Sequence, residues 1–97
     1  IALQGPRARD VIAPLVEGID LSPKAFPHMA VREGTIAGVP TRLFRVSFTG
    51  ELGFEINVPA SEGQKVWDAI FASGKQYGIT PYGTEALGVM RVEGRND

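Results

Sequence analysis

The segment from residue 44 to residue 58 constrains the fold most, because apolar and polar side chains alternate on both sides of a glycine-containing stretch. Alternation with a period of two is typical of half-buried β-strands, and the intervening stretch TGELG (49–53) is typical of a hairpin turn. If TGELG forms a five-residue loop, Phe48 lies opposite Phe54 and Glu55 falls on the polar face. The sequence therefore predicts two antiparallel strands that share one apolar face, made of Phe44, Val46, Phe48, Phe54, Ile56 and Val58.

A strand and a helix are predicted at the start of the chain. Residues 1–3 are apolar and are followed by Gly5-Pro6, where proline suits the first turn of a helix because its missing N–H is not needed there. Apolar residues then recur at helical spacing up to Gly18, although Pro14 interrupts the hydrogen-bond ladder and is expected to kink or shorten the helix. The recurring residues are Val11, Ile12, Leu15 and Val16.

Strands are predicted to resume after an irregular connection. Residues 19–28 contain two prolines and show no periodicity, so they are expected to form a loop. Residues 29–48 then favour two strands joined near IAGVP (36–40), where Gly38 permits the backbone geometry of a turn.

The clearest helical pattern covers residues 61–74. Ser61 and Gln64 have the spacing of a capping box, and Gly74 is a typical stop signal. An apolar stripe along this helix is suited to packing on a sheet, and it places Trp67 in the core rather than in a ligand site. The stripe consists of Val66, Trp67, Ile70 and Phe71.

A final helix is predicted to begin at Thr84, with Leu87 and Met90 facing inward. The resulting order of elements indicates an α+β fold, with an antiparallel sheet, helices packed on one face and a ferredoxin-like character. The chain starts with IALQGP rather than with methionine. Residues 1–97 are therefore expected to be a single partial domain excised from a longer polypeptide.

Composition argues against several classes of function. The 10 basic and 11 acidic residues form no long runs, so neither nucleic acid nor an anionic membrane is expected as a partner. The chain has no cysteine and a single histidine, His28, which leaves no thiolate chemistry and no histidine metal site. No segment resembles a transmembrane helix or a secretory leader, and the cytoplasm is the expected location.

Glu55 is the most informative candidate for a functional residue. A carboxylate in the middle of a strand faces either water or a polar cavity. If its face of the sheet is solvated, Glu55 is an ordinary surface acid. If another part of a longer chain covers that face, Glu55 becomes a fixed acceptor for the N–H/NH2 pair of an amidine-like heterocycle. The residues alone leave both alternatives open.

Three spaced motifs resemble the folate-binding aminomethyltransferase family, which includes the glycine-cleavage T-protein. They are ALQGPRARDVIAPL (2–15), SFTGELGFEINVP (47–59) and PYGTEALGVMRVEG (81–94), in family order. The resemblance implies a larger folate-binding domain, in which the glutamate that matches Glu55 bonds to the pterin ring of tetrahydrofolate. Phe48 matches an aromatic position, commonly tyrosine, that lies near the folate.

Two other features bear on the site that the resemblance implies. Arg91 matches a family arginine and is a candidate folate-site residue, with a structural role favoured. Leu87 stands where the transferases carry an arginine that reaches the folate, so the carboxylate tail of folate must be held differently, or by residues of the parent chain that are not present here. The family's catalytic aspartate belongs to a motif upstream of this sequence, and the isolated 97 residues are expected to be inactive.

Within the family, the serine at position 47 and the 81–94 motif are most similar to the α subunit of heterotetrameric sarcosine oxidase, or to related dimethylglycine oxidases and dehydrogenases. This similarity implies an oxidase that demethylates sarcosine to glycine and passes the one-carbon unit to tetrahydrofolate. Flavin and NAD would be bound elsewhere in the parent complex, and the expected partners are folate, the rest of the parent chain and other oxidase subunits. The alternatives are a glycine-cleavage-type aminomethyltransferase or a non-catalytic folate-binding or assembly domain, and self-association over the open sheet face also stays open.

Overall fold

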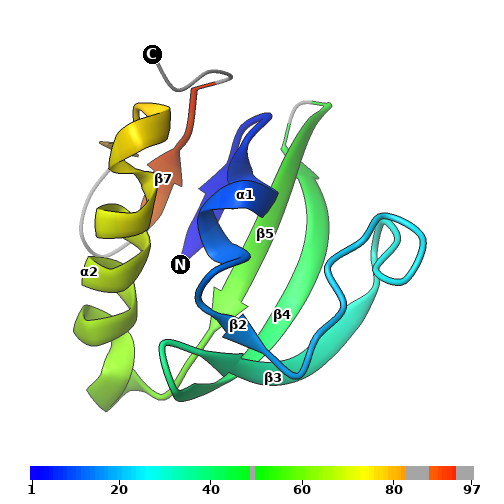
Figure 1. Ribbon diagram of the computed structural model, residues 1–97, viewed down its shortest axis with the longest axis horizontal. Coiled ribbons are helices and arrows are strands. Elements are labelled where there is room, and N and C mark those ends of the chain that lie inside the picture. The colour runs from blue at the N-terminus through cyan, green and yellow to red at the C-terminus, as the bar shows by residue number, and fades with distance from the viewer. Residues whose placement is uncertain (49, 83–87, 94–97) are drawn as a thin grey trace.

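A mixed seven-stranded sheet organises the part of the chain that the computed structural model describes, which is residues 1–48, 50–82 and 88–93 (Figure 1). The strand order is β2-β3-β4-β5-β1-β7-β6. The strands are β1 (Ala2–Gln4), β2 (Val16–Glu17), β3 (Val31–Ile36), β4 (Val39–Phe48), β5 (Glu51–Asn57), β6 (Thr80–Tyr82) and β7 (Val89–Arg91). With two α-helices, α1 (Ala8–Ile12) and α2 (Gly63–Gly74), this arrangement confirms the α+β class.

The sheet is antiparallel except where β1 pairs with β7. Strand β1 lies between β5, to which it is antiparallel, and β7, to which it is parallel. The chain can follow this close path because Gly5, at the end of β1, has φ of +125° and lies against the backbone of Val92. A Cβ atom at position 5 would overlap the carbonyl oxygen of Val92, so only glycine fits there.

The β3–β4 turn falls where the sequence predicts it. Only Ala37 and Gly38 separate the two strands, and both have positive φ, 52° and 80°. Positive φ at both central residues is the geometry of the two-residue turns that match the twist of a hairpin. The N–H of Ala37 also donates to the carbonyl oxygen of Leu15, which ties the turn to the segment before β2.

The predicted register of the β4–β5 hairpin is wrong. Strand β4 runs to Phe48 and β5 begins at Glu51, so Phe48 pairs with Glu51 rather than with Phe54. The shift is an odd number of residues, and it therefore moves the apolar side chains of the two strands to opposite faces. Phe54 faces the core opposite Arg45, whereas Phe44 pairs with Glu55 on the other face.

Helix α1 is shorter than the apolar periodicity predicts. It spans five residues and ends at Ile12, before Pro14, in agreement with the expected effect of proline. Val16 does not continue the helix but begins β2, which pairs with the end of β3.

Helix α2 forms as predicted, although its ends differ in detail. A 3-10 turn (Ala60–Glu62) precedes it, no side chain caps its start, and Gln64 donates to Asp68 instead of closing a capping box. A second 3-10 turn (Lys75–Tyr77) follows α2, and Gly78, with φ of 71°, ends the helical segment in the left-handed conformation.

The predicted final helix is wrong for residues 88–93, the part of this segment that the structure describes. Val89–Arg91 form strand β7, paired with β1 and β6. Met90 is fully buried, so its predicted inward direction is confirmed. Thr84 and Leu87 lie outside the described residues.

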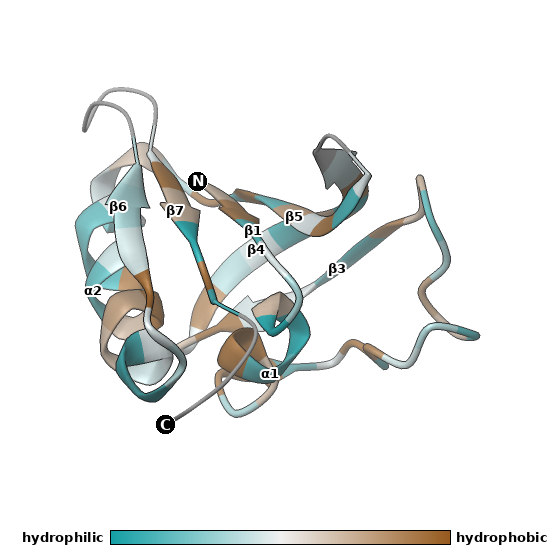
Figure 2. Ribbon diagram, turned by 90° about the horizontal axis from the view of Figure 1, so that it is seen from above, coloured by the Kyte–Doolittle hydropathy of each residue, from teal (hydrophilic) through white to brown (hydrophobic). Residues whose placement is uncertain are grey.

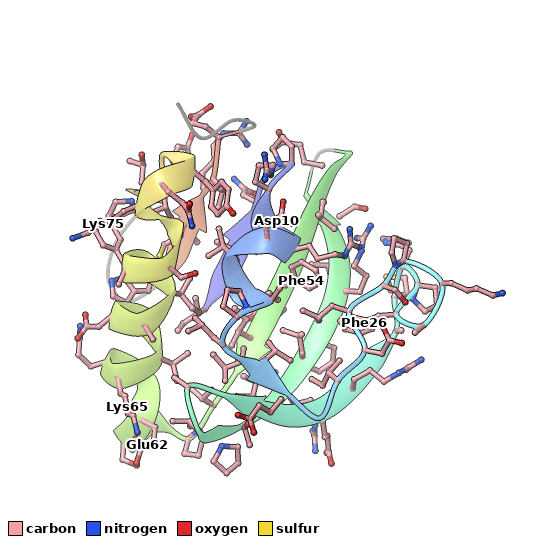
Figure 3. All side chains as sticks on the ribbon, in the orientation of Figure 1. Asp10, Phe26, Phe54, Glu62, Lys65 and Lys75 are labelled. Atoms are coloured by element: carbon pink, nitrogen blue, oxygen red, sulfur yellow. The ribbon has the colours of Figure 1, made fainter. Side chains whose placement is uncertain are left out.

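One face of the sheet carries the core. Figure 2 shows α1 and α2 on the same side of the strands, and Ser73 of α2 donates to the carbonyl oxygen of Val11 at 2.6 Å. The loop at residues 18–30 covers the rest of that face, with Phe26 stacked on Phe54 at a centroid distance of 6.0 Å (Figure 3). Trp67 packs against this core, as predicted. The helices therefore leave the opposite face of the sheet, which we call the outer face, uncovered.

Neither helix in the described ranges is long and apolar enough to cross a lipid bilayer.

The Ala37-Gly38 turn provides a test of the fold. Replacing Ala37→Asn should stabilise the chain by about 0.5–1 kcal/mol, because asparagine tolerates the left-handed conformation that costs other L-residues roughly 1–2 kcal/mol. Replacing Gly38→Ala should destabilise it by about 1 kcal/mol through backbone strain alone, since no atom lies within 4 Å of the added Cβ. Urea unfolding followed by circular dichroism measures both changes. Equal midpoints for the two variants would contradict the turn geometry.

Candidate functional site

A shallow depression on the outer face contains Glu55. It has a volume of about 250 Å³ and is lined by Phe44 and Val46 of β4 and by Glu55 and Asn57 of β5. The strand register brings these four side chains together, because Phe44 pairs with Glu55 and partners in a ladder point to the same face. The depression therefore combines an apolar wall with one carboxylate.

Glu55 is held between two apolar neighbours. It pairs with Phe44 on one side and with Ala2 of β1 on the other, and its side chain is half-buried. Within the described residues, no side chain or backbone group donates a hydrogen bond to its carboxylate, and it forms no ion pair there. Both oxygens are thus available to accept a pair of N–H donors from a ligand.

Phe44 gives the depression a flat apolar surface. Its ring is half-buried even though it lies on the face that the helices do not cover. A planar heterocycle that bonded edge-on to the Glu55 carboxylate could contact this ring by stacking, a contact worth about 0.5–1.5 kcal/mol beyond its buried area.

Phe48, the second candidate from the sequence, lies at the hairpin end of β4. Its backbone pairs with that of Glu51. Its side chain lies outside the described part of the structure, so its predicted contact with a ligand stays a prediction.

Arg91, the third candidate, forms an ion pair with Glu51. Two guanidinium nitrogens of Arg91 donate to the two carboxylate oxygens of Glu51, and the Nη2–Oε2 distance is 2.9 Å. The two residues lie on β7 and β5, so their contact spans the intervening strand β1. The hydrogen bonds from Arg91 hold the pKa of Glu51 below its ordinary value of 4.5, and Glu51 in turn raises the pKa of Arg91. Arg91 does not line the depression around Glu55.

Sequence reasoning missed Phe44 and Val46 as residues of the site. A five-residue loop at 49–53 predicts that both lie on the buried face. The sequence signal that could have identified them is Gly50, because two-residue hairpin loops commonly contain glycine and residues 49–50 can form such a loop. That shorter loop sets Phe44 opposite Glu55 directly.

The described residues contain no group of three or more histidine, aspartate or glutamate side chains that could hold a metal ion. The carboxylate of Glu55 on the outer face is an acceptor suited to an organic ligand with N–H groups.

Comparison with known proteins adds independent information. Residues 1–95 match the GCVT N-terminal domain family model. Sarcosine oxidase subunit alpha of Corynebacterium sp. (strain U-96) is 48% identical over 94 residues, which are 96% of this chain and 10% of that protein. Aminomethyltransferase of Symbiobacterium thermophilum is 38% identical over 96 residues, 98% of this chain and 25% of that protein. The heme-dependent oxidative N-demethylase gamma subunit of Ectopseudomonas mendocina is 41% identical over 93 residues, 96% of this chain and 24% of that protein.

The chain thus spans between a tenth and a quarter of the length of these relatives.

The Glu51–Arg91 pair predicts how stability changes with pH. Because the pKa of Glu51 in the folded chain lies below its ordinary value of 4.5, the pair contributes fully above that pH. Its contribution is lost as the pH falls through the lower folded pKa. Replacing Glu51→Gln removes this ionisation, so the free energy of unfolding should fall less steeply on acidification from about pH 5 to pH 3 than it does in the unmodified chain.

Urea unfolding at a series of pH values measures this dependence. Glu17→Gln is the matched control, because Glu17 is exposed on edge strand β2 and forms no ion pair within the described residues. The free energy of unfolding of Glu17→Gln should change with pH as it does in the unmodified chain. The same slope for all three proteins would mean that the ion pair does not persist in solution.

Proposed function

We propose, because this chain belongs to the GCVT N-terminal domain family, that it is a tetrahydrofolate-positioning segment of an enzyme of the sarcosine oxidase subunit alpha type. The chain would belong to a longer polypeptide, and its outer face would form part of the folate site. The oxidase type is preferred because the relative with that name is 48% identical over 96% of this chain.

The observation that carries the proposal is Glu55 in its depression. A half-buried carboxylate that accepts no hydrogen bond from the part of the chain that the structure describes, set beside an aromatic ring, matches the needs of a pterin. The amino-pyrimidinone edge of the pterin presents adjacent N–H groups that a carboxylate can accept together. The ring of Phe44 would contact the flat side of the pterin.

Phe48 and Arg91 complete the proposed site in different ways. Phe48 would add a second ring contact from the end of β4. Arg91 would stabilise the strands that carry the site rather than contact the ligand. Its guanidinium binds Glu51, and that ion pair connects the start of β5 to β7 across β1.

The role of the segment would be to orient the pterin rather than to transfer protons. Bound tetrahydrofolate would supply the nitrogen that accepts the one-carbon unit from the N-methyl group of sarcosine. Holding that nitrogen in place lowers the entropic part of the barrier, and misplacement by about 1 Å can reduce a rate by about a hundredfold. The catalytic acid, the flavin and NAD sites and the other subunits of such a cytoplasmic enzyme would lie outside this chain, and the chain alone would be inactive.

A second candidate is a segment of a glycine-cleavage-type aminomethyltransferase, favoured by 38% identity to a protein of that name over 98% of this chain. The same tetrahydrofolate site would then serve a protein without the oxidase chemistry. Assay of the full-length protein for sarcosine oxidation separates the two candidates.

Calorimetric titration of the full-length protein with tetrahydrofolate tests the proposed site. Glu55→Gln should weaken binding by roughly 1.5–3 kcal/mol, about ten- to a hundredfold, because the amide presents a donor to a pterin edge that also donates. Glu17→Gln is the matched control, since it makes the same change on the same sheet but outside the depression. Its affinity should equal that of the unmodified protein. If Glu55→Gln also binds tetrahydrofolate normally, Glu55 is a surface acid and the proposed site is wrong.

A further inference from the structure

The depression around Glu55 continues into a second, larger one. The second depression has a volume of about 450 Å³, and Pro40 and Arg42 of β4 and Pro59 are among the residues that line it. Asn57 lines both depressions. Together they form a groove along β4 and β5 on the outer face, which we call the outer groove.

The register gives the outer groove two chemically different ends. In one row across the sheet, Phe44 pairs with Glu55, and in the next row Arg42 pairs with Asn57. The rows are two residues apart along each strand, about 7 Å. An aromatic ring and a carboxylate therefore lie at one end of the outer groove, and a guanidinium lies at the other.

Arg42 is held only weakly by its partner. Its Nη2 donates to Oε1 of Glu33, opposite it on β3, at 3.1 Å. The two side chains are 59% and 71% exposed, and exposed ion pairs of this kind contribute about 0–1 kcal/mol. A guanidinium has five N–H donors, and this contact uses one of them. Arg42 can thus bind a second carboxylate at little cost.

We propose that Arg42 binds the glutamate carboxylates of the folate tail while Glu55 holds the pterin. This inference rests on the proposed function, because it takes the same ligand and extends its site along the outer groove. Charge and the order of the groups along the outer groove support this assignment. Tetrahydrofolate is a flat N–H donor at one end and an anion at the other, and the outer groove presents an acceptor and then a cation in the same order.

The benzoyl group of folate separates its two ends by more than one row of the sheet. The flexible side chain of Arg42 extends the reach of its charge beyond the row in which its backbone lies. Asn57, between the two depressions, can accept or donate to the amide that joins the benzoyl group to glutamate. Arg42 would therefore favour folates with an intact tail over bare pterins.

The test compares two ligands on the full-length protein by calorimetry: tetrahydrofolate and tetrahydropterin, which has the same ring system without the benzoylglutamate tail. Arg42→Ala should weaken tetrahydrofolate binding about fivefold and leave tetrahydropterin binding within about twofold. Arg42→Lys should retain part of the affinity for tetrahydrofolate, since it keeps the charge but loses the planar fork. Added salt should weaken tetrahydrofolate binding more in the unmodified protein than in Arg42→Ala.

Lys65→Ala is the control for loss of one positive charge. Lys65 is exposed on α2 and points away from the sheet (Figure 3), so both affinities should be unchanged. Equal losses for the two ligands in Arg42→Ala, or no loss for either, would overturn the role of Arg42. Glu55→Gln tests the pterin contact separately. If the pterin binds at Glu55, this substitution weakens the binding of both tetrahydrofolate and tetrahydropterin. Normal binding of both by Glu55→Gln would refute the proposed function itself.

Discussion

The register of the β4–β5 hairpin determines what the outer face of this chain can do. Only two residues separate Phe48 from Glu51, and that connection sets Phe44 beside Glu55 and Arg42 beside Asn57. A slip of one residue would turn the side chains of one strand to the opposite face relative to those of the other, so that Phe44 and Glu55 would no longer share a face. The order of ring, carboxylate, amide and guanidinium along the outer groove thus depends on how β4 and β5 pair, as well as on which residues they contain.

The two faces of the sheet have different roles. On one face, α1, α2 and the loop that carries Phe26 bury the apolar side of the sheet, and these contacts stabilise the fold. On the outer face, Phe44 and Val46 stay half-exposed and Glu55 has no donor within the described residues, so this face contributes little to the core. The outer side chains can therefore be fitted to a ligand without disturbing the packing that holds the strands.

Most of the fold could be predicted from the sequence, because its signals are local. Helix α2 and the turn at Ala37-Gly38 follow from apolar periodicity and from glycine. The register of β4 and β5 could not be predicted in the same way, since β4 carries apolar residues on both faces and periodicity does not say which face is buried. Strand β7 was mistaken for a helix because its pairing with β1 joins residues that are distant in sequence. Glu55 was recognised as the key acid, but its neighbour Phe44 depended on the register.

The position of β1 between β5 and β7 has a consequence for biosynthesis. Of these three strands β1 is translated first, yet its partners are residues 53–55 and 89–91. At about 5–20 residues per second, the ribosome needs roughly 5–20 s to make the remainder of this sheet. Throughout that time the edge of β1 that pairs with β7 stays open, and Leu3 lacks its partner Met90. The sheet can therefore be completed only after β7 has been translated, and the synthesis of a distant partner rather than local structure sets when β1 is paired on both sides.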